Sequence, residues 1–261
     1  MAYTFISGAT GGIGRAFCLE CASRGNDLFI TGRSLGKISA IKNEILSKYS
    51  VNIEFFPCDL SKERDRKKMI DYIDQKEIKF DRMIMVAGVD TQKAFADYTM
   101  EKVLFQMRVN VEATISLTHN LLERIENKAE ILVVSSMSGA TPMPYFALYS
   151  ATKAMLTNFY TALHYELKKE GVKVTVVTPG GVYTRPDIVE DIERQGLWGR
   201  LSAKTPKFVA ERSLKALKKN KVKYIPGFFN KLLNVIVKIT PKKIVLSFIA
   251  KRWKKQTKDA F

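Results

Sequence analysis

Cysteine and histidine are scarce in this sequence, which holds three cysteines and two histidines among 261 residues. Cys18 and Cys21 have C-x-x-C spacing, but no second cysteine pair accompanies them, so helix packing explains them better than a redox or metal site. We therefore predict no metal site. The few cysteines suit a reducing compartment, and we expect no signal peptide, because an apolar strand is expected to start by residue 3. Both observations predict a cytoplasmic protein.

Acidic residues are also few relative to basic ones. Lys and Arg number 43 against 26 Asp and Glu, which gives a formal net charge of +17. The sequence contains no internal repeat, low-complexity tract or interior linker. A chain of 261 residues without such features suits one large α/β domain with a well-buried core.

Strand-like and helix-like segments alternate along the chain. We expect strands near residues 3–7, 27–31, 51–57, 80–87, 130–136, 172–178 and 222–225. We expect helices near residues 12–24, 35–49, 61–76, 97–126, 146–170 and 205–219. This alternation predicts a doubly wound parallel sheet of the Rossmann type. It would occupy residues 1–225, and residues 226–261 would form a basic, amphipathic helical extension of the same domain.

A glycine-rich turn follows the first expected strand. Gly8, Gly12 and Gly14 have the spacing G-x-x-x-G-x-G and precede a helical pattern. Glycines allow a tight turn and close backbone approach, and the N–H groups at the start of a helix bind phosphate. The turn therefore predicts a site for the pyrophosphate of a dinucleotide, although the commoner spacing is G-x-G-x-x-G.

Tyr149 and Lys153 lie one helical turn apart and so share a helix face. An ammonium beside a phenol stabilises the phenolate and lowers its pKa from ~10 toward the range of a general acid or base. Ser136 ends an expected buried strand thirteen residues before Tyr149. A serine hydroxyl there can hold a substrate oxygen while the tyrosine transfers a proton.

These residues together resemble the short-chain dehydrogenase/reductase family, over about residues 2 to 225. The resemblance implies that Ser136, Tyr149 and Lys153 are catalytic and that Asn110 supports a proton-relay water. It implies an oxidoreductase that interconverts a carbonyl and a secondary alcohol by hydride transfer. The cofactor contacts that it implies are Gly8, Thr10, Gly12, Ile13, Gly14, Asp59, Leu60, Ala87, Gly88, Tyr149, Lys153, Pro179, Gly180, Val182 and Thr184. Arg33 is added to this set on the ground of its charge.

One motif departs from the family pattern. The family usually has Asn-Asn-Ala-Gly after the fourth strand, whereas this chain has Met85-Val86-Ala87-Gly88. The loss of both asparagines leaves open an alternative function, a catalytically idle NADP(H)-binding protein that acts as a membrane-surface scaffold or redox sensor. The complete Asn, Ser, Tyr and Lys set argues against it.

Charge favours NADP(H) over NAD(H) as the cofactor. A carboxylate at the end of the second strand would bind the adenosine ribose and repel a 2′-phosphate. Gly32 occupies that position and Arg33 follows it, and a guanidinium matches a phosphate with two charge-assisted hydrogen bonds. Gly11 weakens this argument, because many NADP-using relatives have a basic residue there.

The substrate pocket is expected between Ser136 and Tyr149 and in the segment 185–204, which we expect to be a mobile lid. The predicted substrate contacts are Ser138, Met143, Tyr145, Phe146 and Trp198. These are mostly apolar and favour a steroid, a 3-oxoacyl group or another lipid-like carbonyl or alcohol over a sugar. Alternatively, the aromatic residues are ordinary core. By resemblance, a homodimer would form through the helices near 97–126 and 146–170, with Phe159 and Leu163 exposed.

The positive charge is concentrated near the C-terminus. Residues 221–261 have a net charge of +10, against +7 for residues 1–220, and Pro241 separates two expected short helices. Their uncharged stretches are far shorter than the ~20 residues of a membrane span. The apolar face of these helices would pack on the body and close the substrate pocket. Alternatively, the helices would lie on an anionic membrane surface or bind a protein partner. Nucleic acid is not an expected partner, because aromatic residues are not interleaved with the charges.

Overall fold

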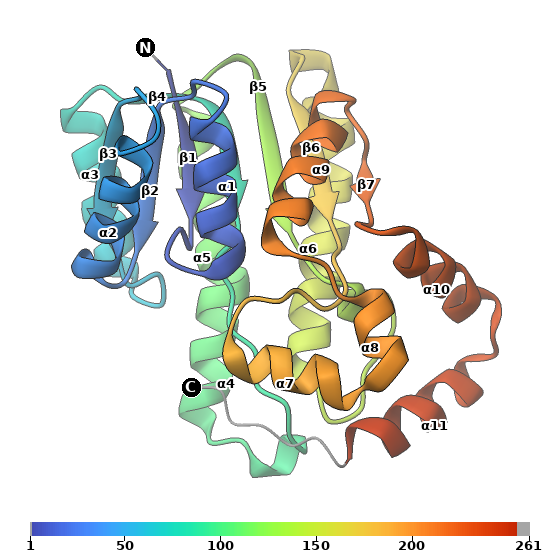
Figure 1. The fold of residues 1–261 in the computed structure, drawn as a ribbon. Helices are drawn as coiled ribbons and strands as arrows, with labels where there is room; N and C mark the ends of the chain where they lie inside the picture. Colours follow the sequence, from blue (N-terminus) through green and yellow to red (C-terminus); the bar gives the residue numbers. More distant parts are fainter. Residues whose placement is uncertain (1, 255–261) are drawn as a thin grey trace.

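Seven parallel strands form one sheet in the order β3-β2-β1-β4-β5-β6-β7 (Figure 1). The structure is a computed structural model that describes residues 2–254. The strands are β1 (Ala2–Ser7), β2 (Leu28–Gly32), β3 (Ile53–Pro57), β4 (Lys79–Met85), β5 (Ile125–Val134), β6 (Lys173–Val177) and β7 (Lys223–Tyr224). The strand order reverses between β1 and β4, and doubly wound sheets bind their ligands beside such a reversal. The predicted Rossmann-type fold is confirmed.

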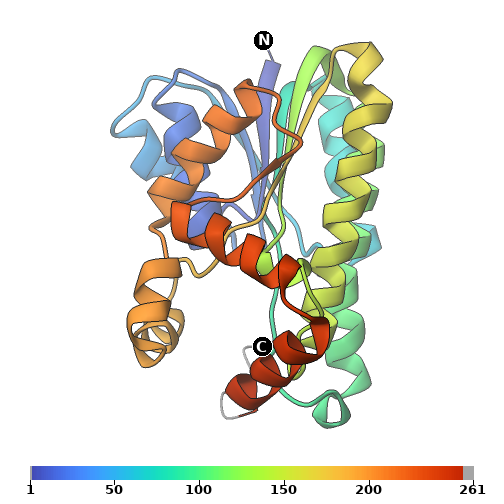
Figure 2. The ribbon, with the colours of Figure 1, turned by 90° about the vertical axis from the view of Figure 1, so that its right-hand side faces the viewer.

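Helices cover both faces of the sheet (Figures 1 and 2). One apolar core lies between the sheet and the helices α1 (Gly12–Ala22), α2 (Leu35–Leu46) and α9 (Pro206–Lys218). A second core lies on the opposite face, under α3 (Glu63–Gln75), α5 (Ala113–Leu122) and α6 (Ala147–Glu166). In this second core, the ring of Phe80 packs edge-on against Phe5 and Phe29, with centroids 5.7 and 5.8 Å apart. Burial on both faces explains why the strands are almost continuously apolar.

The helix predicted over residues 97–126 is shorter than expected and contains an irregular turn. The chain forms α4 (Met100–Met107), a π-helical turn (Arg108–Glu112) and α5, which ends at Leu122. A π turn holds an extra residue and often marks a functional site. Strand β5 already begins at Ile125, opposite Phe80, and its register shifts before Glu130 pairs with Arg82. Lys128, with φ of 63°, lies within this irregular stretch.

The segment expected to be a lid forms two short helices, α7 (Pro186–Arg194) and α8 (Gly196–Ser202). Pro186 stands in the first turn of α7, where the missing N–H costs nothing. That this segment moves stays a prediction.

The two helices expected on either side of Pro241 are present as α10 (Phe228–Ile239) and α11 (Lys242–Trp253). Helix α10 follows β7 and lies beside α8, and α11 continues from α10 (Figures 1 and 2). Residues 255–261 of the predicted extension lie outside the described residues. Within residues 2–254, no helix has the length and apolar character needed to cross a bilayer.

Candidate functional site

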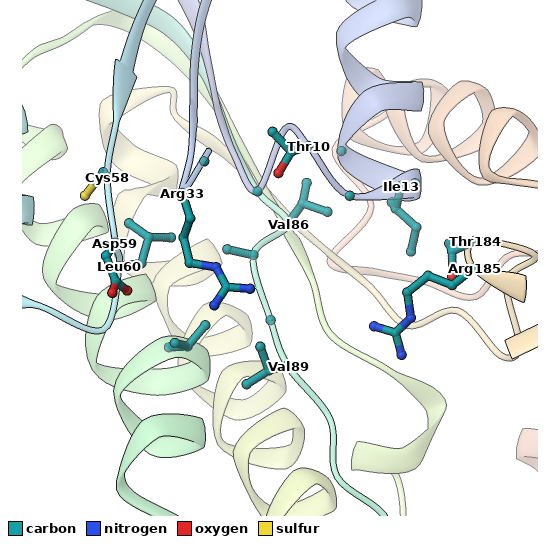
Figure 3. Close-up of a pocket in the computed structure, with 18 of the residues that line it drawn as sticks. Thr10, Ile13, Arg33, Cys58, Asp59, Leu60, Val86, Val89, Thr184 and Arg185 are labelled. Carbon is teal, nitrogen blue, oxygen red and sulfur yellow. The ribbon is translucent and has the colours of Figure 1, made fainter. Parts of the chain in front are cut away.

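A pocket opens where β1, β2 and β4 end (Figure 3). Its walls come from the glycine turn, the ends of β2 and β3, the loop after β4, helix α4 and the loop before α7. The lining residues are Gly8, Thr10, Gly11, Gly12, Ile13, Gly14, Gly32, Arg33, Cys58, Asp59, Leu60, Val86, Ala87, Gly88, Val89, Phe105, Val109, Thr184 and Arg185. The pocket therefore brings together most of the residues predicted to bind the cofactor.

The glycine turn fits a dinucleotide pyrophosphate. Gly8 has φ of +66°, and a Cβ there would lie 2.8 Å from Ala87 Cα. A Cβ on Gly14 would lie 2.1 Å from Gly8 O, so these positions require glycine. Gly11 caps α1 without a side-chain hydrogen bond, and the first turn holds no acidic residue. The N–H groups of this turn are thus suited to an anion.

The other end of the pocket carries a guanidinium. Arg33 is exposed and extends toward the pocket (Figure 3), with its guanidinium carbon 6.0 Å from the centre of the Phe105 ring. No ion pair among residues 2–254 neutralises Arg33. A Cβ on Gly32 would lie 2.9 Å from Thr10 Cγ2, so glycine lets β2 approach the turn. Asp59 Oδ1 accepts hydrogen bonds from the N–H and hydroxyl of Ser61, at 3.1 and 2.8 Å.

Five predicted cofactor contacts do not line this pocket: Tyr149 and Lys153, described below, and three residues of the loop after β6. Pro179 O accepts a hydrogen bond from the N–H of Met137 at 2.9 Å, which joins the loop after β6 to the loop after β5. Gly180 packs against the side chain of Asn230, and Val182 is buried and forms a parallel bridge with Lys204. Their contact with a cofactor stays a prediction.

Tyr149 and Lys153 lie on α6, one turn apart, as predicted. Lys153 is 3% exposed, and its Nζ donates a hydrogen bond to Val134 O at 2.9 Å and lies 5.7 Å from the centre of the Tyr149 ring. A Cβ on Gly88 would lie 3.2 Å from Lys153 Nζ, so this glycine leaves room for the ammonium. Lys153 therefore stands between the loop after β4 and the tyrosine.

The pKa of Tyr149 is not lowered as the sequence predicted. Burial raises the pKa of this phenol, the carboxylate of Asp90 raises it further, and a hydrogen bond to Ser136 opposes the rise. Burial lowers the pKa of Lys153 to about 8, against the attraction of Asp90. The prediction considered only the attraction between Tyr149 and Lys153. It left out the burial of the phenol away from water, which is the largest influence on its pKa and raises it.

Asn110 lies in the π turn and is fully buried. Its Oδ1 accepts a hydrogen bond from Val89 N–H at 2.7 Å, and its Nδ2 donates to Val89 O at 2.9 Å and to Thr152 Oγ1 at 3.2 Å. The amide thus fixes the loop after β4 to helix α6. Its predicted support of a relay water stays a prediction.

Comparison with known proteins identifies the family. A family model described as short chain dehydrogenase matches residues 2–194. The chain belongs to the short-chain dehydrogenase family. The very-long-chain 3-oxoacyl-CoA reductase of Laccaria bicolor is 33% identical over 179 residues, 66% of this chain and 52% of that protein. Hydroxysteroid dehydrogenase-like protein 1 of Gallus gallus is 33% identical over 191 residues, 70% of this chain and 56% of that protein. The matches thus span only about half the length of these relatives.

Solved structures show the same fold. A structure from a study of 7beta-hydroxysteroid dehydrogenase stereoselectivity is 24% identical, with a TM-score of 0.86, and covers 95% of this chain and 96% of that one. A short chain dehydrogenase from Burkholderia cenocepacia J2315, solved in complex with NADP, is 19% identical with a TM-score of 0.75. It covers 87% of this chain and 97% of that one.

In this short-chain dehydrogenase, the predicted substrate residues separate into two places. The hydroxyl of Ser136 accepts a hydrogen bond from Ser138 N–H at 3.1 Å, and Met143 and Phe146 are buried just before α6. Tyr145, with φ of 63°, joins them in the same loop. Trp198 lies on α8, where it packs against Phe229 of α10 with ring centroids 5.3 Å apart.

Two stacked aromatic rings cover Tyr149, the tyrosine predicted to be catalytic. Phe146 stacks on Tyr149, and Trp253, at the end of α11, stacks on Phe146 with centroids 5.8 Å apart and planes at 13°. The end of α11 therefore packs on the body beside Tyr149. The apolar face of these helices, which one interpretation of the sequence placed against the body, is instead largely exposed.

Sequence analysis missed several residues of the site. Phe105 and Val109 lie four residues apart on one helix face, a spacing that could have placed them together beside the pocket. Arg185 directly follows the predicted contact Thr184, extends toward the pocket (Figure 3), and pairs with Asp90 at 3.7 Å and Asp187 at 3.1 Å. No pattern in the sequence predicts that Trp253 meets Phe146.

Proposed function

We propose that this short-chain dehydrogenase uses NADP(H) to interconvert a carbonyl and a secondary alcohol on an apolar substrate, with Tyr149 as general acid or base. One observation carries the proposal: Tyr149 lies between Ser136 and Lys153 next to the glycine-lined pocket, under a wall of apolar rings.

The residues of the pocket support a nicotinamide dinucleotide. The N–H groups at the start of α1 would hold the pyrophosphate, and Ala87 and Gly88 leave the backbone after β4 open to the ribose. Arg33 would bind the 2′-phosphate, which supports NADP(H) over NAD(H). When bound, this cofactor supplies the hydride.

In the proposed reduction, the hydroxyls of Ser136 and Tyr149 hold the carbonyl oxygen of the substrate. Negative charge develops on that oxygen as the hydride arrives, and the two hydroxyls stabilise it most in the transition state. Tyr149 then gives up its phenolic proton to the oxygen. In oxidation of the alcohol, the phenolate accepts the proton instead.

Lys153 and Asp90 would adjust this proton transfer. The ammonium of Lys153 stabilises the phenolate that remains after Tyr149 has donated its proton. The carboxylate of Asp90 opposes the loss of the Lys153 charge and raises the pKa of Tyr149. Asn110 would act through the backbone of Val89, which it holds beside Lys153.

The substrate class is inferred from the walls around Tyr149. Met143, Phe146 and Trp253 offer apolar surface and few hydrogen-bonding groups. Relatives named as 3-oxoacyl-CoA reductases and hydroxysteroid dehydrogenase-like proteins support a long-chain or polycyclic ketone.

A homodimer through α4, α5 and α6 is also part of the proposal. Leu163 is buried and Phe159 packs on the core, so neither residue is the exposed contact that the sequence predicted.

The proposal is tested by following NADPH oxidation with steroid ketones, 3-oxoacyl thioesters, long-chain aldehydes and polar sugar ketones. We expect turnover with one or more apolar ketones and none with the sugars. NADPH binding without turnover on any carbonyl would support the idle NADP(H)-binding protein instead.

A further inference from the structure

Helices α10 and α11 are attached to the body of the enzyme at both ends. Asn230, in the first turn of α10, is fully buried, and its Nδ2 donates hydrogen bonds to Ser202 O and Pro226 O, both at 2.8 Å. At the end of α11, Trp253 stacks on Phe146, and Arg252 Nη2 donates to Gln195 Oε1 at 3.2 Å. The two helices thus have a defined position, and their exposed side chains form a defined surface.

The outer side of these helices is apolar. Seven large apolar side chains are between 43% and 82% exposed there: Phe228, Leu232, Val235, Ile236, Ile239, Ile244 and Phe248. We call these seven residues the tail face. The first five have the spacing of a single face of α10. An amphipathic helix normally turns such a face toward the core, whereas this one turns it to solvent.

Neighbouring aromatic residues extend the apolar area. Phe229 lies on the half-buried side of α10 and contacts Trp198, which is 57% exposed on α8. Isolated exposed apolar residues are ordinary on protein surfaces, but a contiguous set of this kind marks an interaction site.

The charge along the helices of the tail face has one sign. Residues 228–253 contain six Lys or Arg and no Asp or Glu, and residues 212–253 contain twelve basic residues, again with no acidic one. Lys231 and Lys238 are exposed and lie along one edge of the tail face on α10. Lys242 and Lys243, at the start of α11, are exposed between the α10 residues and the α11 residues of the tail face. A partner must therefore offer negative charge beside an apolar region.

We propose that the tail face docks on an anionic lipid bilayer. Lipid headgroups supply the negative charge, and the acyl chains accept the Ile, Val, Leu and Phe side chains. A second copy of the chain would bring two basic faces together in a symmetric contact, which repulsion disfavours. Nucleic acid would leave the aliphatic side chains against phosphates, without an apolar environment.

Docking in this way would place the catalytic site at the bilayer. Trp253 shares helix α11 with Ile244 and Phe248 of the tail face and touches Phe146 above Tyr149. A lipid-like ketone would then pass from the membrane to the tyrosine over apolar side chains. This step rests on the proposed function, but the docking itself does not, and it can be measured without turnover.

The test is sedimentation of the full-length protein with vesicles of phosphatidylcholine alone and of phosphatidylcholine with phosphatidylserine. We expect binding to the anionic vesicles, weakened by salt. Replacing Lys238 and Lys242 by Gln should weaken it about fivefold for each lysine. Val235→Asp with Ile239→Asp should abolish it, because a carboxylate opposes both insertion and attraction. These side chains are exposed, so folding should be unaffected.

Matched controls lie on α2 and in the turn directly after it, and α2 is on the opposite side of the molecule from α10 (Figure 1). Leu46→Asp is the apolar control, and Lys37→Gln with Lys48→Gln is the charge control. Equal weakening by the control and tail variants would overturn the proposal, because general attraction by the net charge would then explain binding. Failure to bind anionic vesicles would overturn it too, as would a dimer that depends on Val235 and Ile239. Since no turnover is measured, these outcomes are independent of the proposed reaction.

Discussion

The rings of Phe146 and Tyr149 stack face to face, with centroids 4.4 Å apart and planes inclined by 23°. Phe146 immediately precedes α6, so the start of the helix positions one wall beside Tyr149. Trp253 covers the other side of Phe146, although the two residues are far apart in the chain. The C-terminal helices thereby become part of the environment of Tyr149.

Replacing Trp253 by Ala should weaken the binding of apolar ketones. The indole provides a large apolar surface at the edge of the site, and loss of such a contact costs about 2 kcal/mol, which corresponds to a rise in KM of about thirtyfold. We expect kcat to change little, because Trp253 does not reach the reacting atoms. Phe248→Ala, on the outer side of the same helix, is the control and should leave KM unchanged. A thirtyfold loss of kcat at constant KM would contradict this role.

Replacing Asp90 by Asn should lower the pKa of both Tyr149 and Lys153, because the carboxylate raises both. Oxidation of an alcohol needs the phenolate of Tyr149, so its rate rises as pH passes the pKa of that phenol. The rising limb of kcat/KM against pH should therefore move to lower pH in the variant. Asp187→Asn is the control, since Asp187 shares Arg185 with Asp90. A limb that stays in place, or moves equally in the control, would contradict the effect of Asp90.

Replacing Lys153 by Met should abolish activity but stabilise the fold at neutral pH. Burial lowers the pKa of Lys153 from 10.5 to about 8, so holding the charge in the folded protein costs up to about 3 kcal/mol below pH 8. Loss of its hydrogen bond to Val134 O offsets about 1 kcal/mol of that gain.

The direction of this change in the free energy of unfolding can be checked by urea unfolding at several pH values. A lysine with a lowered pKa in the folded state makes the native protein more stable as pH rises from about 8 toward 10.5. Lys153→Met should lose this rise, whereas the exposed control Lys169→Met should keep it. A variant that is less stable than the native protein at neutral pH would show that the ammonium is not costly there.

Replacing Arg33 by Ser should remove the preference for NADPH. Two charge-assisted hydrogen bonds to a phosphate contribute about 2 to 3 kcal/mol, so kcat/KM for NADPH should fall by roughly thirty- to a hundredfold. The value for NADH should hardly change, because NADH has no 2′-phosphate. Lys37→Gln, one turn into α2, is the matched control. Equal losses for both cofactors would mean that Arg33 does not bind that phosphate.

The order of strands and helices could be predicted from the sequence because buried parallel strands and amphipathic helices have distinct patterns. All seven expected strands form, and the glycine turn, Arg33, Asp59 and Ala87 converge on one pocket. Their convergence follows from the fold, since strands in a parallel sheet end at one edge.

Features that depend on tertiary contacts could not be predicted. The helical pattern over residues 97–126 runs through Asn110 without a break. The π turn there accompanies hydrogen bonds of the Asn110 side chain with Val89 and Thr152, which are distant in the sequence. The start of β5 at Ile125 depends on pairing with Phe80. The stacking of Trp253 on Phe146 and the raised pKa of Tyr149 both arise from packing between distant segments.

The most direct test of the central claim is the turnover of Tyr149→Phe with NADPH and the best apolar ketone of the panel. Loss of the phenolic proton should lower kcat by about a hundred- to ten-thousandfold, while the Kd for NADPH, measured by fluorescence titration, stays close to that of the native enzyme. Tyr165→Phe, on the exposed part of the same helix, should behave like the native enzyme. A variant at position 149 that keeps kcat within a few-fold would contradict the assignment of Tyr149 as the proton donor.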